Sequence, residues 1–295
     1  MNPQSWKAHL ALFGVSSIYG VNYFIAKFVF TEVSPFGVVA IRSIGSVIGF
    51  WLIARWWIRE PISDRKDYLL LCISGLCGAS LNQIFFFWGL SKTQAVNASV
   101  LMTLTPIFVF LTAYLLRTEK MTYLKVMGLL FSFAGAALIS LGGRKLSIDH
   151  TTIIGDGMIL FNAAVYGIFL VIVRPLMLKY HFITVMKWAL LFGACINIPL
   201  GIPDLMIVDW PGLSTQAIWG IVFIVLLVTM GAYSLNSWAL QQLPSSAVGI
   251  YIYLQPVIVA CLAFFLNRGG MTGDKLGYML LVFVGVYLVT YRKKN

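Results

Sequence analysis

The sequence predicts an all-α integral membrane protein with ten transmembrane helices, arranged as two inverted five-helix repeats. Three observations lead to this fold class. Of the 295 residues, 60% are hydrophobic and 11% are charged, whereas soluble domains carry about 25% charged residues. Apolar segments long enough to span a bilayer follow one another with short loops. One motif also occurs twice, once in each half of the chain.

The first five apolar segments each approach the length of about 20 residues that a spanning helix needs. The first carries a stripe of polar side chains, the second contains Arg42, and the third contains two adjacent amides. The fourth is interrupted by Pro106, and the fifth carries small residues at helical spacing. We expect these helices at residues 8–30, 36–56, 67–90, 94–116 and 121–142.

The second five segments have the same character. The sixth contains Asn162 and Tyr166, the seventh begins around Lys187, and the ninth is interrupted by Pro256. All ten are apolar around most of their circumference, unlike amphipathic soluble helices, and they lack the period-two alternation of a membrane β-barrel. The first segment is too long for a cleaved signal peptide, so we expect it to be retained. The helices are expected at residues 155–174, 182–203, 217–240, 245–266 and 274–291.

The two halves align without a gap at an offset of 150 residues. A Trp, a Pro within an apolar segment and a Met-Thr-x-x-Lys motif coincide: Trp88 with Trp238, Pro106 with Pro256, and residues 121–125 with 271–275. The chain therefore divides into a first repeat, residues 1–146, and a second, residues 147–295. Five helices per repeat force the second copy to enter the membrane from the opposite side. Such inverted repeats place a substrate site near the midplane, at their interface.

The net charge of +11 is spread over loop ends and gathers on no single face, so we expect no nucleic-acid partner. Most Lys and Arg residues fall on one side of the membrane if the N-terminus is cytoplasmic. We therefore expect a multi-pass protein of the cell's inner (plasma) membrane with both termini in the cytoplasm and the lipid bilayer as its surroundings.

Four stretches resemble the EamA family of the drug/metabolite transporter superfamily. They are YGVNYFIAK in the first helix, SPFGVVAIR with Arg42 in the second, TPIFVFLTAYLLRTEKMT in the fourth and LQPVIVACLAFFL in the ninth. The resemblance implies ten helices, cytoplasmic termini and export or exchange of small metabolites. Two departures stand out. Tyr19 and Tyr166 occupy positions where the family usually has Trp, and Glu119 has no counterpart in the second half, where residues 267–270 read Asn-Arg-Gly-Gly.

Two cations inside the apolar segments have a structural and a functional interpretation. Ionisable groups at membrane depth are costly and often functional. Arg42 would anchor a substrate carboxylate or phosphate, because its guanidinium binds such groups with two parallel hydrogen bonds; the alternative is a structural Arg that snorkels. Lys187 loosely aligns opposite Arg42 in the repeat, and its alternative is an interfacial Lys beside Trp188.

Uncharged polar side chains are dense at central depth. Each needs a partner there because lipid offers none, so they either line a hydrated substrate cavity or join helices by hydrogen bonds. The candidates are Tyr19, Asn22, Tyr23, Asn82, Gln83, Thr103, Asn162, Tyr166, Tyr233, Asn236, Tyr251 and Gln255. Pro106 and Pro256 would free carbonyls one turn earlier and act as hinges, or simply kink their helices.

Central Asp, Glu and His residues are absent from the apolar segments. The sequence thus offers no catalytic constellation and no metal-ligand spacing, and we expect neither an enzyme nor a cofactor. Coupling to protons or cations is disfavoured for the same reason, since such carriers use intramembrane carboxylate or His relays.

These observations favour an alternating-access transporter that exports or exchanges a small-molecule substrate, with amino acids or related compounds preferred. A carrier for drugs, purines or other metabolites is the alternative within transport. A non-transporting scaffold or receptor-like protein is the alternative of another class. The Gly45-x-x-x-Gly49 motif permits close packing of helices and allows a homodimer.

Overall fold

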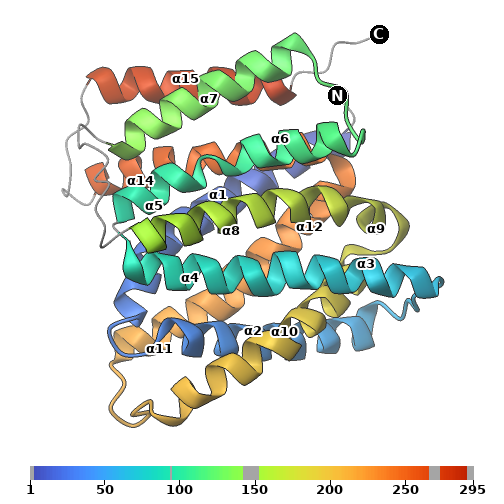
Figure 1. Ribbon diagram of the computed structural model, residues 1–295, viewed down its shortest axis with the longest axis vertical. Helices are drawn as coiled ribbons and strands as arrows, with labels where there is room; N and C mark the ends of the chain where they lie inside the picture. Colours follow the sequence, from blue (N-terminus) through green and yellow to red (C-terminus); the bar gives the residue numbers. More distant parts are fainter. Residues whose placement is uncertain (1–2, 94, 142–152, 266–272, 291–295) are drawn as a thin grey trace.

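The structure is a computed structural model that describes residues 3–93, 95–141, 153–265 and 273–290. Within these ranges all regular structure is helical (Figure 1). Eight helices are long and apolar enough to cross a membrane, and two shorter apolar helices span Val100–Leu115 and Tyr123–Ile139. An all-helical fold with several apolar spans is therefore confirmed. The number of ten crossings stays a prediction.

The first half begins with two long helices. The third span is continuous but changes helix type in its middle, and the fourth is split in two. The elements are α1 (Pro3–Val29), α2 (Pro35–Trp57), α3 (Arg65–Gly75), the π-helix η1 (Leu76–Leu81), α4 (Asn82–Lys92), α5 (Ala95–Met102), α6 (Thr105–Leu115) and α7 (Tyr123–Leu141).

The second half repeats this order, including the change of helix type and the divided span. Its elements are α8 (Ile153–Ile172), the short α9 (Arg174–Lys179), α10 (Phe182–Met206), α11 (Thr215–Phe223), the π-helix η2 (Ile224–Gly231), α12 (Ala232–Gln242), α13 (Ser245–Gly249), the 3₁₀ helix η3 (Ile250–Tyr253), α14 (Leu254–Phe265) and α15 (Gly273–Thr290).

Local signals explain where several helices begin. Ser34 accepts a hydrogen bond from the Gly37 amide at 3.1 Å and is followed by Pro at the first turn of α2. The Ser214 hydroxyl accepts one from the Ala217 amide at 3.1 Å at the start of α11. Such caps satisfy amides that a helix leaves unpaired at its N-terminus, and Pro fits the first turn because it has no amide to pair.

The fourth and ninth spans are irregular directly before their prolines. Residues 103 and 104 form a turn between α5 and α6, two residues before Pro106. The 3₁₀ helix η3 ends at Tyr253, three residues before Pro256. A proline cannot donate to the residue one turn earlier, which explains why both breaks lie on its N-terminal side.

Helices far apart in the sequence lie side by side. α1 packs against α12 and α14, while α8 packs against α4 and α6. α2 packs against α10, and α7 against α15. In Figure 1, α1 runs from right to left and α8 from left to right. The pairs formed by α1 in one half therefore correspond to those formed by α8 in the other. The α2–α10 and α7–α15 pairs each join equivalent helices of the two halves.

The α7–α15 pair packs through small residues. A Cβ atom added to Gly285 would lie 2.4 Å from the carbonyl oxygen of Gly128 and 2.1 Å from the Ser132 hydroxyl oxygen. The Ser132 hydroxyl donates to the Val282 carbonyl at 3.3 Å. The two backbones can approach this closely only where side chains are absent or very small.

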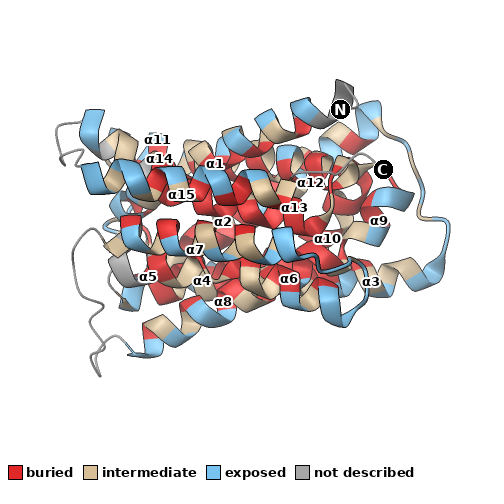
Figure 2. Ribbon diagram, turned by 90° about the horizontal axis from the view of Figure 1, so that it is seen from above, coloured by how far each residue is buried: buried red, intermediate tan, exposed pale blue. Residues whose placement is uncertain are grey.

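The buried residues are concentrated in the middle of the helix bundle. Figure 2 shows buried residues toward the middle of the bundle and exposed residues on its outer faces and at its ends. Many exposed side chains are large and apolar, among them Phe13, Leu52, Trp219 and Phe283. Apolar outer faces are what a lipid surrounding requires, and the interior is left to hold the polar groups.

A polar cavity at the centre of the bundle

Helices from both halves enclose a central cavity. Its unfilled space measures about 600 Å³, a volume that includes space open to the surroundings. The lining includes ten of the residues expected from the sequence: Tyr19, Asn22, Tyr23, Arg42, Asn82, Gln83, Asn162, Tyr166, Tyr233 and Gln255.

Arg42 is the charged group of this cavity. Its side chain comes from α2, and the residue is only 4% exposed. Its Nε donates to the Thr229 hydroxyl oxygen at 2.9 Å, and its guanidinium carbon lies 5.0 Å from the centre of the Phe87 ring. In the part of the chain that the structure describes, Arg42 has no carboxylate within ion-pair distance. The positive charge is thus held by a neutral hydroxyl and an aromatic face.

The π-helix η2 supplies the partner of Arg42. The Thr229 hydroxyl donates to the carbonyl of Ile224, five residues earlier, at 2.8 Å. With its proton committed there, its oxygen is available to accept from Arg42. The other π-helix, η1, ends directly before Asn82 and Gln83. A π-helix turns the residues that follow it onto a different face than a regular helix would, and such segments are frequent at functional sites.

Amide and phenol groups of several helices hydrogen-bond to one another in and beside the cavity. Gln83 Nε2 donates to the Tyr233 hydroxyl at 3.2 Å, and these two residues occupy the same position in the two halves. Asn236 Nδ2 donates to the Tyr166 hydroxyl at 3.3 Å. Asn162 donates to the backbone carbonyl of Asn82. These contacts are the helix-joining interpretation of the polar residues. The Gln83–Tyr233 and Asn162–Asn82 contacts cross between the halves and their residues line the cavity, whereas the Asn236–Tyr166 contact lies within the second half.

Several buried acceptors in this region have no hydrogen-bond partner among the residues that the structure describes. They are the side-chain carbonyl oxygens Asn22 Oδ1, Gln83 Oε1 and Asn162 Oδ1. Buried polar atoms are rarely left unpaired in folded proteins, so a bound molecule with N–H or O–H groups would satisfy them. The cavity thus offers a cation from α2 and unpaired acceptors from α1, α4 and α8.

Four expected residues lie outside this lining. Thr103 is buried at the break between α5 and α6, where its hydroxyl donates to the Val100 carbonyl. Asn236 and Tyr251 line a smaller adjoining cavity with an unfilled volume of about 250 Å³. The Tyr251 hydroxyl is hydrogen-bonded to His9 Nδ1 at 2.8 Å.

Lys187 does not face Arg42. Its ammonium lies 5.0 Å from the ring centre of Trp51 and 5.5 Å from that of Trp188, and it borders a separate groove at the surface. Lys187, a candidate for the central cavity, is thus not part of the lining that contains Arg42, because α10 turns it toward aromatic side chains at the rim. This is the interfacial alternative considered for Lys187 from the sequence.

Sequence reasoning missed six residues of the site. The lining also contains Phe86, Phe87, Met102, Val228 and Ile252, and Thr229 holds Arg42. Phe86 and Phe87 follow Gln83 by three and four residues, so the polar face of the third span could have indicated them. Val228 and Thr229 carried no such signal, because their orientation depends on the π-helix.

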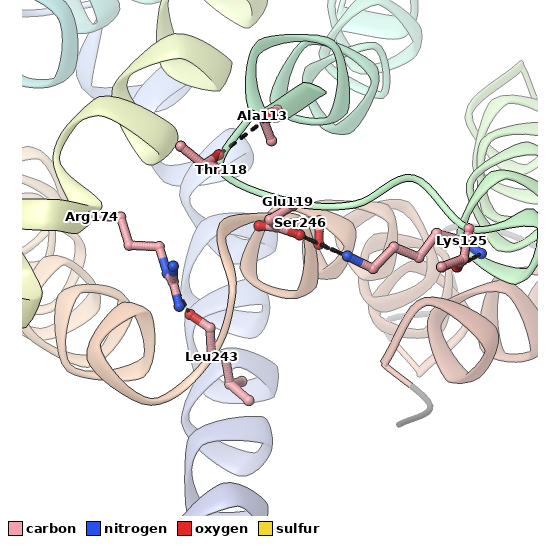
Figure 3. Close-up of polar contacts among 8 residues, drawn as sticks. Ala113, Thr118, Glu119, Lys125, Arg174, Leu243 and Ser246 are labelled. Atoms are coloured by element: carbon pink, nitrogen blue, oxygen red, sulfur yellow. Dashed lines mark hydrogen bonds and ion pairs between the residues drawn. The ribbon is translucent and has the colours of Figure 1, made fainter. Parts of the chain in front are cut away.

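Apolar side chains pack beside the cavity on the side toward the start of α1. Leu12, Leu170, Leu240 and Val248 belong to one buried cluster there. Around the same side, polar contacts fix the junction between α12 and α13 (Figure 3). Arg174 Nε donates to the Leu243 carbonyl at 3.3 Å, and the Ser245 hydroxyl donates to the Leu170 carbonyl at 2.8 Å.

Glu119 ties the two halves together on this side (Figure 3). Its carboxylate accepts hydrogen bonds from the Ser246 amide at 3.0 Å and from the Ser246 hydroxyl. Lys125 pairs with the same carboxylate at 2.8 Å and donates to the Ser246 hydroxyl oxygen at 3.3 Å. We call Glu119, Lys125 and Ser246 the inter-half latch. Arg117, with φ of 54°, turns the chain after α6 so that Glu119 reaches α13.

The latch is ionic at neutral pH. Burial by itself would raise the pKa of the Glu119 carboxyl, but the hydrogen bonds from Lys125 and Ser246 outweigh burial and hold that pKa below its usual value. Hydrogen bonds to the charged form of a carboxyl always act in this direction. Glu119 is therefore a carboxylate under physiological conditions.

A membrane-embedded bundle with a buried polar cavity between two similar halves defines the chain as a multi-pass membrane protein of the transporter class. The sequence profile of the EamA-like transporter family matches residues 6–141 and 153–291. The chain belongs to this family, as the resemblance in the sequence implied.

Relatives agree with this assignment. An uncharacterized transporter of Archaeoglobus fulgidus is 26% identical over 97% of this chain and 98% of its own length. A probable terminal-alkyne amino-acid exporter of Streptantibioticus cattleyicolor is 26% identical over 70% of this chain and 67% of its own length. A crystal structure with 18% identity covers 97% of this chain and 98% of its own with a TM-score of 0.75, which shows that the fold is shared.

Proposed function

We propose that this protein is an alternating-access carrier that exports or exchanges amino acids or closely related metabolites across the inner membrane. The observation that carries the proposal is Arg42, a buried cation without a carboxylate partner among the described residues, facing a central cavity. A substrate carboxylate would supply the missing counter-charge with two parallel hydrogen bonds.

The unpaired acceptors support a zwitterionic substrate. Asn22 Oδ1, Gln83 Oε1 and Asn162 Oδ1 are suited to receive hydrogen bonds from an ammonium group. Phe86, Phe87 and Met102 add an apolar wall for a side chain. One relative carries the name of a probable amino-acid exporter, which agrees with this substrate class.

Alternating access is proposed from the arrangement of the halves. Opposite directions of α1 and α8 (Figure 1) and the matching helix pairs support two inverted repeats, residues 1–146 and 147–295, that rock about the cavity. Both chain ends would then lie in the cytoplasm. In this arrangement the inter-half latch closes the cytoplasmic side, and it must open in the opposite state.

The test is flux in proteoliposomes that contain the purified protein. Vesicles loaded with a panel of unlabelled amino acids should accelerate uptake of a labelled amino acid when the substrate is shared, and the rate should saturate. Purines and phenolic acids belong in the same panel, because the aromatic lining would also accept a planar ring. Saturable exchange of purines alone would replace the amino-acid proposal, and the absence of any saturable flux would contradict a carrier.

A further inference from the structure

A second groove lies at the surface, away from the central cavity. It is formed by the C-terminal half of α2, the segment that follows it and the start of α10, and its unfilled volume, open space included, is about 1290 Å³. Its basic residues are Arg55, Arg59 and Lys187, and its acidic residue is Glu60. A Glu60 carboxylate oxygen accepts the His181 amide at 2.9 Å. The groove therefore carries an excess of positive charge.

The groove changes character along α2. Ile48, Trp51 and Leu52 form its apolar part and are 56%, 39% and 53% exposed. Arg55 follows one turn further on the same helix face, and Arg59 lies just beyond the end of α2, where its Nε donates to the Arg55 carbonyl oxygen at 3.3 Å. At 1.5 Å per residue, Ile48 and Arg55 are about 10 Å apart along the helix. One stripe thus runs from lipid-exposed apolar side chains to cations.

Aromatic residues place the change of character at the level of the membrane interface. Trp51 and Trp188 pack edge to face at 5.5 Å, and Tyr68 packs on Trp188 at 5.1 Å. Trp and Tyr concentrate where headgroups begin. The Lys187 ammonium lies over both Trp rings, and among the described residues it has no ion-pair partner.

We propose that this groove binds an anionic phospholipid, with the headgroup phosphate between Arg55, Arg59 and Lys187 and an acyl chain along Ile48, Trp51 and Leu52. A free phosphate would satisfy the cations and leave the apolar part of the groove bare. A zwitterionic lipid would fill the apolar part and leave the excess positive charge uncompensated. Basic pockets between spanning helices are suited to anionic headgroups. The site is separate from the central cavity and does not depend on the transported substrate.

The test measures lipid binding by the full chain. Protein is purified in zwitterionic phosphatidylcholine nanodiscs, phosphatidylglycerol is titrated in, and bound lipid is counted by native mass spectrometry. The variant R55Q/R59Q/K187Q should lose phosphatidylglycerol affinity at least tenfold. The matched variant K7Q/R65Q/K66Q removes the same charge from exposed positions on the same side and should stay within twofold of the parent chain.

Further experiments distinguish lipid binding from binding of a soluble anion, and a loss of binding from a loss of folding. Trp51→Ala should weaken phosphatidylglycerol binding severalfold, because it removes the apolar wall. Glycerol phosphate in solution should fail to displace the lipid; equal competition would show a soluble-anion site and overturn the proposal. Equal losses in the two triple variants would also overturn it. Melting temperatures in phosphatidylcholine confirm folding, and Lys187→Gln alone serves if the triple variant does not fold.

Discussion

Arg42 lies in the third turn of the membrane-spanning helix α2, where it is hydrogen-bonded to one hydroxyl and lies over one aromatic ring. Burying a charge without a counter-charge is expensive, and a cation–π contact returns only about 0.5–2 kcal/mol. A purely structural Arg would be expected to reach helix-end carbonyls or the interface. The unpaired acceptor oxygens nearby belong to residues that line the cavity, so the groups still able to form hydrogen bonds lie where a substrate would bind.

Replacing Arg42 should therefore separate binding from folding. Arg42→Gln should reduce exchange in proteoliposomes about 100-fold, since losing a buried charge pair costs about 2–5 kcal/mol. Arg42→Lys should recover little, because a point charge cannot form two parallel hydrogen bonds. Thr229→Val should raise KM with little effect on the maximal rate. Wild-type exchange by Arg42→Gln, with the protein normally inserted, would assign Arg42 a structural role.

At the scale of elements, the two π-helices and the two interrupted spans determine which side chains meet. η1 precedes Asn82 and Gln83, and η2 carries Thr229 toward Arg42. The break before Pro256 leaves the short helix α13, in which the Ser246 amide and hydroxyl donate hydrogen bonds to the Glu119 carboxylate. Each irregular segment lies beside either the cavity or the latch. The irregular segments thus orient the side chains of the cavity and the latch, while the regular helices hold these segments in position.

The latch should respond to Glu119 and to pH. Glu119→Gln removes the ion pair with Lys125, so the side toward the start of α1 should open more often. In a background without native cysteines, Val248→Cys, which is buried beneath the latch, should react severalfold faster with an impermeant thiol reagent from that side. Glu32→Gln is the matched control, since Glu32 binds the Ser214 amide and hydroxyl at 2.8 and 2.6 Å at a different junction.

The direction of the pH effect follows from the lowered pKa of Glu119. A carboxyl whose pKa is lower in the closed state stabilises that state fully above its ordinary pKa of 4.5, and the contribution is lost as pH falls through the lowered value. Labelling of Val248→Cys, corrected for the thiolate fraction, should be constant near neutral pH and rise only in acid. Glu119→Gln should abolish this rise; its persistence would assign the acid effect to another group.

Close packing of α7 on α15 should be sensitive to a single methyl group. Gly285→Ala would place a Cβ 2.4 Å from the Gly128 carbonyl oxygen, and overpacking of this kind costs about 1–3 kcal/mol. Gly277→Ala lies on the same helix, where no atom of the described residues comes within 4 Å of the added Cβ. Thermal melting in detergent should show a lower Tm for Gly285→Ala and an unchanged or higher one for Gly277→Ala. Equal melting temperatures would contradict the tight contact.

At the scale of the whole molecule, α1 begins and α15 ends on the same side, on the right of Figure 1. The connection between α6 and α7, which carries Glu119, and the connection after α2 lie on that side too, whereas the connection between α10 and α11 lies on the opposite side. Basic residues are frequent at the first side, including Arg55, Arg65 and Arg117. The positive-inside rule therefore predicts that this side faces the cytoplasm.

Single cysteines test this topology in cells. Arg65→Cys and Arg117→Cys should be modified only after the membrane is opened to an impermeant reagent, and Asp209→Cys, in the connection between α10 and α11, should react in intact cells. All three positions are exposed. The reverse pattern would invert the orientation and place the latch on the outer side.

The helical spans followed from the sequence because lipid leaves the backbone no other partner than itself, so a long apolar segment must form a helix. The same cost made Arg42, Asn162 and Gln83 visible as residues that need an interior environment. Prolines at matching positions indicated where the fourth and ninth spans are interrupted. These conclusions depend only on local chemistry and on the solvent.

Only the tertiary structure decided which side chains share a cavity. The direction in which a helical residue points depends on how its helix is rotated and packed, and that depends on contacts distant in sequence, such as Gly128 against Gly285. Apolar residues 224–231 gave no indication of a π-helix, so the contact of Thr229 with Arg42 was not predicted, and Lys187 was aligned with Arg42 although α10 turns it to the rim. Glu119 was recognised by resemblance, but its partner Ser246 lies 127 residues away. Spans follow from the cost of exposing backbone to lipid, whereas a site between two halves follows from their packing.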